Sequence, residues 1–307
     1  MNVKVLALTK YGRLGASSRM RTLQYMPLLE RQAVAITLVP MMHDEALALR
    51  YDHGAYGAVT LLRAYLHRCQ ALLKRKQFDV VWIEKEALPW LPLWLEQGLL
   101  RGVPYVLDYD DAIFHNYDLH RLGLVRLLYS SRLDGLMAGA ALVVAGNNYL
   151  AQRARNAGAT HVEVVPTVID LERYPTPAPN TAAQAPLCIV WIGSPSTARY
   201  LQLLREPLQA LSLRFNFVFR VIGGGPVDLP GVQLEVLPWT EDTEVQAMSA
   251  CHVGVMPLAD SPWERGKCGY KLIQYMACGL PVVASDVGVN ADIVQTGNNG
   301  FLASSSA

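Results

Sequence analysis

The first half of the chain alternates short apolar runs with longer amphipathic stretches. Nearly continuous apolar runs of this length are typical of strands in a parallel sheet that is covered on both faces. The pattern predicts helices at Ser17–Arg31, with Ser17 or Ser18 as N-cap, and at Ala58–Lys76, and an irregular segment at Met41–Tyr56. Strands are predicted at Val3–Leu8, Val34–Val39, Asp79–Ile83, Tyr105–Leu107, Ala141–Ala145 and Val162–Val165. We therefore predict a doubly wound α/β domain that ends near Asp170.

The second half repeats this alternation after a proline-rich break. Leu171–Pro186 contains four prolines and little apolar sequence, so we predict a linker there. The helices that follow are predicted at Thr197–Leu211, Glu241–Ala250 and Tyr270–Cys278. Strands are predicted at Cys188–Ile192, Phe217–Ile222, Val232–Val236, Val253–Met256 and Val282–Ala284. The predicted domains are residues 1–170 and 187–307, joined by a linker at 171–186.

Composition narrows the class of protein and of partner. Charged residues make up 17% of the 307 residues, below the usual share of about 25%, which favours a large core or a surface kept apolar for a partner or membrane. The net charge of +1 and the lack of a basic run argue against nucleic acid as a partner. Five scattered cysteines indicate reduced thiols. We see no signal peptide and no apolar run long enough to span a bilayer, so we expect a cytoplasmic protein.

The stretch Trp263–Ser285 combines a loop, a helix and a buried strand. Lys267, Lys271 and Gln274 share one face of this helix. Lysines at a helix N-terminus are unfavourable by themselves, because that end has partial positive charge. A bound anion would make the electrostatic energy of this arrangement favourable. The alternative is a solvated basic face.

Two other strands of the second half also end in loops that contain glycine. Gly193 and Gly223 lie in these loops, and Arg199 lies in the first turn of the predicted helix after Gly193. Because the ends of strands in one parallel sheet meet at one edge, the three loops are expected to lie together. They predict a phosphate site, and more specifically a diphosphate site, because two helix N-termini share it.

Polar residues also follow the strand ends of the first half. A G-x-G-x-x-G spacing is absent, so no nicotinamide dinucleotide site is predicted. Asp108 and Asp110 form a D-x-D pair, but only Asp111 clusters with them in sequence, so a role of Asp110 or Asp111 as an N-cap or as a holder of sugar hydroxyls is favoured over a metal site. His115 is either a general base or a hydrogen-bonded structural histidine. The candidate residues at this edge are Gly15, Ser18, Arg19, Arg21, Asp110, Asp111 and His115.

One stretch of the first half is unusually apolar for its prolines. It runs from Leu88 to Leu95 and contains Trp90 and Trp94. It can be a core or interdomain helix, or an aromatic patch that rests at a bilayer surface or on a lipid acceptor.

The second half resembles glycosyltransferase family 4, retaining enzymes of the GT-B fold. The specific match is KLIQYMACGLPVVAS with the following Gly288, Asn290 and Asn299–Leu302, and VWIGSPSTARYL, Trp239 and His252–Leu258 extend it. The runs SSRMR and DYDDAIF of the first half are similar to the sugar-acceptor domain of bacterial members. The resemblance implies two Rossmann-like domains that face a cleft, a nucleotide-diphosphate sugar on the second domain, no metal and no further cofactor.

The resemblance also assigns the donor site by position. It implies that Gly193, Ser194 and Arg199 meet the phosphates, and that Lys267 and the backbone near Gly269 do likewise. The complete candidate donor set is Gly193, Ser194, Thr197, Arg199, Gly223, Trp239, Lys267, Gly269, Lys271 and Gln274.

This sequence departs from the family pattern at two places. Gln274 stands where most of the family has the second glutamate of an E-x7-E motif, which holds the ribose, and Gly266 stands where it has the first. Glu264 is the nearest carboxylate that can replace the first. The chain also ends at Ala307, before the helices with which the family normally continues, so we expect a fragment or a shortened member.

The main hypothesis is a retaining glycosyltransferase that moves a sugar from a nucleotide-diphosphate donor to an acceptor hydroxyl. The acceptor would be a glycan or a lipid-linked sugar in polysaccharide or glycolipid assembly, and the enzyme would make peripheral contact with the inner face of the membrane. Two alternatives remain open. One is a non-catalytic nucleotide-sugar-binding homologue or scaffold subunit, and the other is a nucleotide-sugar epimerase of the same fold.

Overall fold

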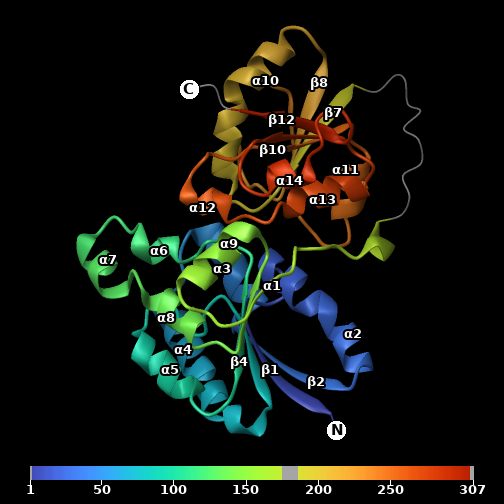
Figure 1. The fold of residues 1–307 in the computed structure, drawn as a ribbon. Coiled ribbons are helices and arrows are strands. Elements are labelled where there is room, and N and C mark those ends of the chain that lie inside the picture. Colours follow the sequence, from blue (N-terminus) through green and yellow to red (C-terminus); the bar gives the residue numbers. More distant parts are fainter. Residues whose placement is uncertain (1, 175–185, 305–307) are drawn as a thin grey trace. The chain divides into compact units, whose positions relative to one another are not determined.

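The chain divides into two compact units (Figure 1). A computed structural model describes residues 2–174 and 186–304. Unit 1 comprises Met1–Thr167 with Gly266–Cys268, and unit 2 comprises Val168–Arg265 with Gly269–Ala307. The predicted linker begins with a short 3₁₀ helix, η3 (Leu171–Arg173), and its residues 175–185 lie outside the described residues.

Unit 1 is built on a parallel sheet with the strand order β2-β1-β3-β4-β5-β6. Its strands are β1 (Val3–Tyr11), β2 (Val34–Met42), β3 (Val80–Glu84), β4 (Tyr105–Tyr109), β5 (Leu142–Ala145) and β6 (Val162–Val164). The six strands predicted in the first half are thereby confirmed. Their apolar runs are continuous because both faces of the sheet are covered, and Val5–Leu8 is buried throughout.

Helices cover both faces of this sheet. Figure 1 shows α1 and α2 on one side and α4, α5 and α8 on the other, as right-handed crossovers from β1 to β2 and from β2 to β3 require. The helices are α1 (Ala16–Arg21), η1 (Leu23–Tyr25), α2 (Met26–Arg31), α3 (Asp44–His53), α4 (Ala58–Leu73), η2 (Arg75–Gln77), α5 (Leu93–Leu100), α6 (His115–Asp118), α7 (Gly123–Tyr129), α8 (Arg132–Ala138) and α9 (Asn148–Asn156).

Two predictions for the segment after β1 are wrong. The single helix predicted at Ser17–Arg31 is broken into α1, η1 and α2, and a proline stands in the first turn of α2, where its missing N–H is tolerated. The N-cap of α1 is Gly15, without a side-chain cap bond, rather than Ser17 or Ser18. Ser18 is instead fully buried inside the helix.

The irregular segment predicted at Met41–Tyr56 is also wrong. Strand β2 extends to Met42, and α3 follows. This helix buries only Leu47, so it lacks the apolar stripe by which helices are predicted. Its ends are better defined, because Asp44 and Glu45 lie in its first turn and Gly54 follows it in the left-handed conformation.

Unit 2 contains a second parallel sheet, with the strand order β12-β11-β10-β7-β8-β9. The predicted helix Thr197–Leu211 is only partly correct, because its first half is a 3₁₀ helix. The strands are β7 (Leu187–Ile192), β8 (Phe217–Ile222), β9 (Leu234–Leu237), β10 (Val253–Met256), β11 (Val282–Ser285) and β12 (Gly300–Ala303). The helices are η4 (Ala198–Leu204), α10 (Arg205–Ser212), α11 (Glu244–Ser249), α12 (Pro262–Arg265), α13 (Tyr270–Ala277) and α14 (Asn290–Ile293).

Strand β7 separates two buried cores of unit 2. Val190 and Ile192 belong to the core that contains Leu272 and Tyr275 of α13. Trp191, between them in sequence, belongs to the core on the opposite face, with residues of η4 and α10. The alternation follows from the two-residue repeat of a strand, and it holds the carboxyl end of β7 firmly in place.

The apolar stretch from Leu88 to Leu95 is not a core element throughout. Leu88 is fully buried, but Trp90 is 47% exposed and Trp94 is 72% exposed. A core position for both tryptophans, one of the two interpretations of the sequence, is therefore wrong.

Candidate active site

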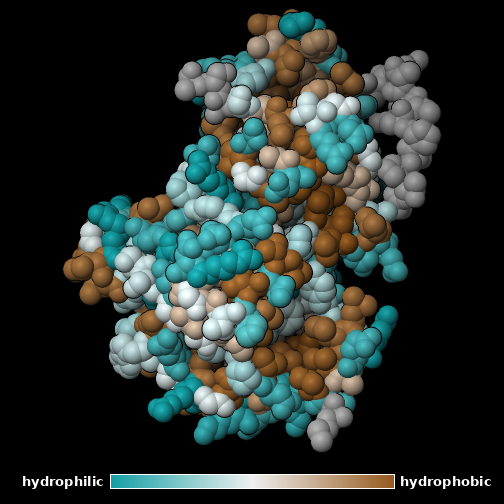
Figure 2. Space-filling view, in the orientation of Figure 1, coloured by the Kyte–Doolittle hydropathy of each residue, from teal (hydrophilic) through white to brown (hydrophobic). Residues whose placement is uncertain are grey.

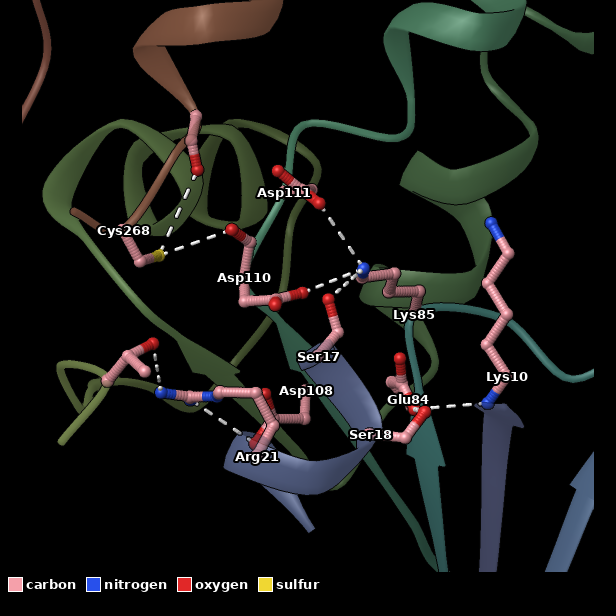
Figure 3. Close-up of polar contacts among 12 residues, drawn as sticks. Lys10, Ser17, Ser18, Arg21, Glu84, Lys85, Asp108, Asp110, Asp111 and Cys268 are labelled. Atoms are coloured by element: carbon pink, nitrogen blue, oxygen red, sulfur yellow. Dashed lines mark hydrogen bonds and ion pairs between the residues drawn. The ribbon is translucent and has the colours of Figure 1, made fainter. Parts of the chain in front are cut away.

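A cluster of charged side chains lies at the carboxyl edge of the unit 1 sheet (Figure 3). Glu84, the last residue of β3, accepts hydrogen bonds from Ser18 Oγ at 2.5 Å and from the backbone N–H of Lys10 at 3.0 Å. Burial raises the pKa of Glu84, and the charge of Lys85 offsets this only in part. The buried serine of α1 thus ties this helix to the end of the sheet.

Lys85 is the centre of this cluster. Its Nζ lies 2.8 Å from Asp110 Oδ1 and 3.5 Å from Asp111 Oδ2, and it donates to Ser17 Oγ at 3.1 Å. Burial alone would lower the pKa of Lys85, but Asp110, Asp111 and Glu84 together raise it well above its usual value. The backbone at Lys85 has φ 67°, an unfavourable conformation for lysine that aims its side chain into the cluster.

Arg21 and Asp108 form a second buried pair in Figure 3. The guanidinium donates to the two carboxylate oxygens at 2.8 and 3.3 Å, and also to the carbonyl of Val165 at 2.7 Å. Burial raises the pKa of Asp108 to about 6, although Arg21 opposes the shift. The pair fixes the loop after β6 against the end of β4.

Asp111 lies between two lysines of unit 1. Lys267 Nζ is 3.4 Å from Asp111 Oδ1, and Lys85 is on the other oxygen. Burial alone would raise the pKa of Asp111, but Lys267 and Lys85 together lower it to about 2. A carboxylate with so low a pKa is a poor proton acceptor at neutral pH, so Asp111 suits charge placement or hydroxyl binding better than general-base catalysis.

The remaining candidates of unit 1 lie outside the charge cluster. His115 has partners on both ring nitrogens, Asp118 at 2.8 Å and the hydroxyl of Tyr149 at 2.8 Å. This is the hydrogen-bonded arrangement that the sequence left open beside a general base. Arg19 donates to the carbonyl of Arg13 at 2.8 Å, and Gly15 lies against the ring of Tyr11, where a β-carbon would be 2.4 Å from the tyrosine Cβ.

Two glycine loops pack against each other at the carboxyl edge of the unit 2 sheet. Gly193 and Gly223 directly follow β7 and β8, and their loops touch. A β-carbon on Gly223 would lie 2.5 Å from the carbonyl oxygen of Gly193 and 2.7 Å from Cβ of Trp239. Since Gly223 also has φ 76°, only glycine fits there without strain. The structure thus brings together three of the predicted donor-site residues.

Ser194, Thr197 and Arg199 follow β7 as predicted, but the helix that contains Arg199 is the 3₁₀ helix η4 rather than an α-helix. Thr197 Oγ1 accepts from the N–H of Ser194 at 3.2 Å and donates to its carbonyl at 3.0 Å, which closes the turn. The side chain of Arg199 is 67% exposed and stacks on the ring of Tyr200. The buried carboxylate of Glu264 accepts from the hydroxyls of Tyr200 and Ser261.

Gln274 lies in a buried polar cluster that the sequence did not predict. Its Nε2 donates to the hydroxyl of Tyr174 at 3.2 Å and to Glu244 Oε2 at 3.4 Å. Glu244 also accepts from Trp239 Nε1 at 2.7 Å, and Arg173 lies 3.5 Å from its other oxygen. Glu244 was missed because no motif surrounds it, and only the fold places it beside α13.

The helix that contains Gln274 begins at the predicted glycine. Gly269 is the N-cap of α13 and has φ 66°, where a β-carbon would also meet Ile293. Lys271 lies in the first turn, with Nζ 5.7 Å from the ring centroid of Trp191. Among the described residues, no group of three or more His, Cys, Asp or Glu side chains is arranged to hold a metal ion.

Comparison with known proteins places this geometry in context. Residues 186–307 match a family model described as glycosyl transferases group 1. A comparison with curated proteins found no match.

Solved structures resemble the whole chain. Sucrose-phosphate synthase from Thermosynechococcus elongatus has a TM-score of 0.70 at 12% identity, over 100% of this chain and 87% of that one. Anabaena HepE in complex with UDP-glucose has a TM-score of 0.67 at 18% identity, over 99% and 86%. A UDP-forming trehalose-phosphate synthase from Burkholderia xenovorans has a TM-score of 0.59 at 11% identity, over 95% and 86%. With its two parallel sheets and these neighbours, the chain has the GT-B fold of two Rossmann-like domains.

Proposed function

We propose that the protein is a retaining glycosyltransferase of group 1. It would transfer a sugar from a nucleotide-diphosphate donor to the hydroxyl of a glycan or lipid-linked acceptor in polysaccharide or glycolipid assembly. The proposal places the enzyme in the cytoplasm, at the inner face of the membrane. It rests on one observation above the others. The residues that match the family model contain the two touching glycine loops at the carboxyl edge of the unit 2 sheet.

The donor would bind at this edge of unit 2. The exposed guanidinium of Arg199 suits the diphosphate, whereas the backbone N–H groups of Gly193 and Gly223 already donate to the carbonyls of Ile222 and Leu237. Lys271, in the first turn of α13, would add positive charge where negative charge develops on the leaving group, whereas Lys267 belongs to unit 1 and lies 3.4 Å from Asp111. The similar HepE structure contains UDP-glucose, which makes a uridine nucleotide the first donor to test.

The acceptor would bind at the charge cluster of unit 1. Asp110 and Asp111 would orient the attacking hydroxyl, because Lys85 and Lys267 hold the two carboxylates in place. A bond forms between this hydroxyl oxygen and the anomeric carbon, while the bond from that carbon to the donor phosphate breaks. We propose that a leaving phosphate oxygen takes the hydroxyl proton, so that neither His115 nor an aspartate must act as base. No metal is required in this scheme.

The test combines binding with turnover. The full chain would be titrated calorimetrically with UDP, GDP and ADP, and nucleotide release from the corresponding sugars would be measured with and without an acceptor panel. We expect nucleoside diphosphate binding, acceptor-dependent release that persists in EDTA, and a product whose anomeric configuration by NMR equals that of the donor.

Each other result favours a specific alternative. Binding without turnover on any acceptor would favour a non-catalytic subunit, an interpretation supported by Gln274 at the position of the ribose-binding glutamate. A product formed without any acceptor would favour an epimerase. An inverted product would refute the retaining mechanism, and loss of activity in EDTA with recovery in Mg²⁺ would refute metal independence.

A further inference from the structure

One exposed surface of unit 1 is both apolar and basic. We call it the α7 surface. It consists of the exposed leucines at and before α7, which are 55–80% exposed: Leu119, Leu122, Leu124, Leu127 and Leu128. Figure 1 shows α7 projecting from the rest of unit 1, and Figure 2 shows hydrophobic surface at the same place. Five large apolar side chains on one projecting segment are unusual for a surface without a partner.

The α7 surface continues onto the tryptophan loop that precedes α5. The ring of Trp90 lies 4.8 Å from that of Tyr117 and 5.8 Å from that of His120. Its backbone N–H also donates to the hydroxyl of Tyr117 at 3.0 Å. The half-exposed indole is thus fixed against His120, which lies between Leu119 and Leu122 in sequence. An indole with one apolar face and one polar N–H suits the boundary between lipid tails and headgroups.

The charges of this segment have one sign. Arg121 and Arg126 are exposed, and no acidic residue occurs between Asp118 and Asp134. Asp118 itself is paired with Arg153 at 2.9 Å and with His115. Arg126 donates to the carbonyls of the preceding loop, which holds its charge next to the leucines. Leucines interleaved with arginines fit a surface that is apolar at depth and anionic at its boundary.

We propose that the α7 surface docks on a bilayer that contains anionic lipids. Leucines of α7 and the ring of Trp90 enter the headgroup boundary, while the two arginines meet lipid phosphates. The same arginines would repel those of a second copy of the chain on a self-complementary interface. None of the described helices is long and apolar enough to cross a membrane. The proposal does not depend on the proposed sugar transfer, because docking is measured without any sugar.

The experiment measures binding of the full chain to vesicles. Phosphatidylcholine vesicles would be compared with vesicles that also contain phosphatidylglycerol, by co-sedimentation at low and high salt. We expect binding to the anionic vesicles only, weakened by salt. Leu124→Gln with Leu127→Gln and Leu128→Gln should weaken it by about a hundredfold. Arg121→Gln and Arg126→Gln should each weaken it by about fivefold.

Matched controls separate this surface from general stickiness. Leu213→Gln with Phe215→Gln removes two exposed apolar side chains of unit 2, which are 89% and 50% exposed. Leu62→Gln with Leu66→Gln does the same on α4 of unit 1. Both controls should bind vesicles as the wild type does, and all variants should melt at the wild-type temperature, since every changed side chain is exposed.

Three results would overturn the proposal. The first is equal loss of binding in a control pair and in the α7 triple variant. The second is unchanged binding of the triple variant to anionic vesicles. The third is a wild-type protein that does not bind vesicles but dimerises with increasing concentration in sedimentation, when the triple variant stays monomeric. This result would assign the surface to a second copy of the chain.

Discussion

Replacing Gln274 by glutamate should destabilise unit 2, although most of the resembling family has glutamate there. The amide of Gln274 donates to Glu244 across 3.4 Å. In Gln274→Glu this donor is lost and a second carboxylate occupies its place. Both positions are buried, at 2% and 1% exposure, so water cannot separate the two charges.

The structure sets the size of the effect. Two unit charges at that separation repel by roughly 5 kcal/mol at an effective dielectric constant of about 20. The pair can avoid this by binding one proton. At pH 7 that costs about 3.7 kcal/mol for a group with the ordinary glutamate pKa of about 4.3. The smaller of the two costs is the one that applies, and Arg173, 3.5 Å from Glu244, reduces it. We therefore expect a loss of about 2–4 kcal/mol at pH 7.

The sign of the pH dependence follows from the same proton. In the folded variant the carboxylate pair binds a proton that the unfolded chain releases near pH 4, so the folded state gains stability as pH falls. The loss should therefore shrink by about 1.4 kcal/mol for each pH unit between about pH 7 and pH 4.5.

Hydrogen exchange at amides of β7 and β10 would measure this loss within unit 2. The control is the exchange of charges, Gln274→Glu with Glu244→Gln, which keeps one carboxylate and one amide in contact. It should recover most of the stability, whereas Glu244→Gln alone leaves Arg173 without this partner. The reasoning fails if Gln274→Glu is as stable as the wild type at both pH 5 and pH 7. It also fails if the exchanged pair is no better than the single variant.

Three further predictions concern both units. Gly223→Ala should cost about 1–3 kcal/mol, because its methyl would meet Trp239 in a strained conformation, and should weaken UDP binding; an unchanged melting temperature would contradict this. Asp108→Asn should reduce a gain in melting temperature that the wild type shows between pH 7 and pH 5. That gain is expected because burial, partly opposed by Arg21, raises the pKa of Asp108 to about 6, above its ordinary value of about 3.9; parallel pH profiles would rule it out. Lys271→Ala should weaken UDP binding roughly ten- to a hundredfold while uridine binding is unchanged, and equal calorimetric affinities would refute a phosphate contact.

The strands could be predicted because each is decided by its own residues. Val5–Leu8 and Val190–Ile192 are buried on both faces, so the sequence there is apolar without interruption. Helix α3 could not be predicted in this way, because Leu47 alone faces the core and its ends determine it instead. The break before α2 was visible as Pro27, which the amphipathic pattern outweighed.

The site was predictable only where local sequence determines it. Gly223 could be predicted as a site residue, because a glycine directly after a buried strand indicates a close approach of backbones. The contact of Gln274 with Glu244 joins residues 30 positions apart and exists only after α11 and α13 pack on the same face of the sheet. The sequence shows that Lys85 is charged, but it does not predict that Lys85 lies at the centre of a cluster, because its left-handed backbone is a consequence of the fold.

The two sheet edges suit different ligands for an electrostatic reason. At the unit 1 edge, the buried charges are paired with one another, as Lys85 with Asp110 and Arg21 with Asp108. Such an edge attracts no further ion strongly, but its carboxylates can still accept hydrogen bonds from neutral hydroxyls. At the unit 2 edge, the loops after β7 and β8 contain no carboxylate before Asp228, and Arg199 is 67% exposed although its guanidinium lies 3.9 Å from the buried carboxylate of Glu264. We therefore expect the free energy of binding to favour an anionic diphosphate at unit 2 and a neutral sugar hydroxyl at unit 1.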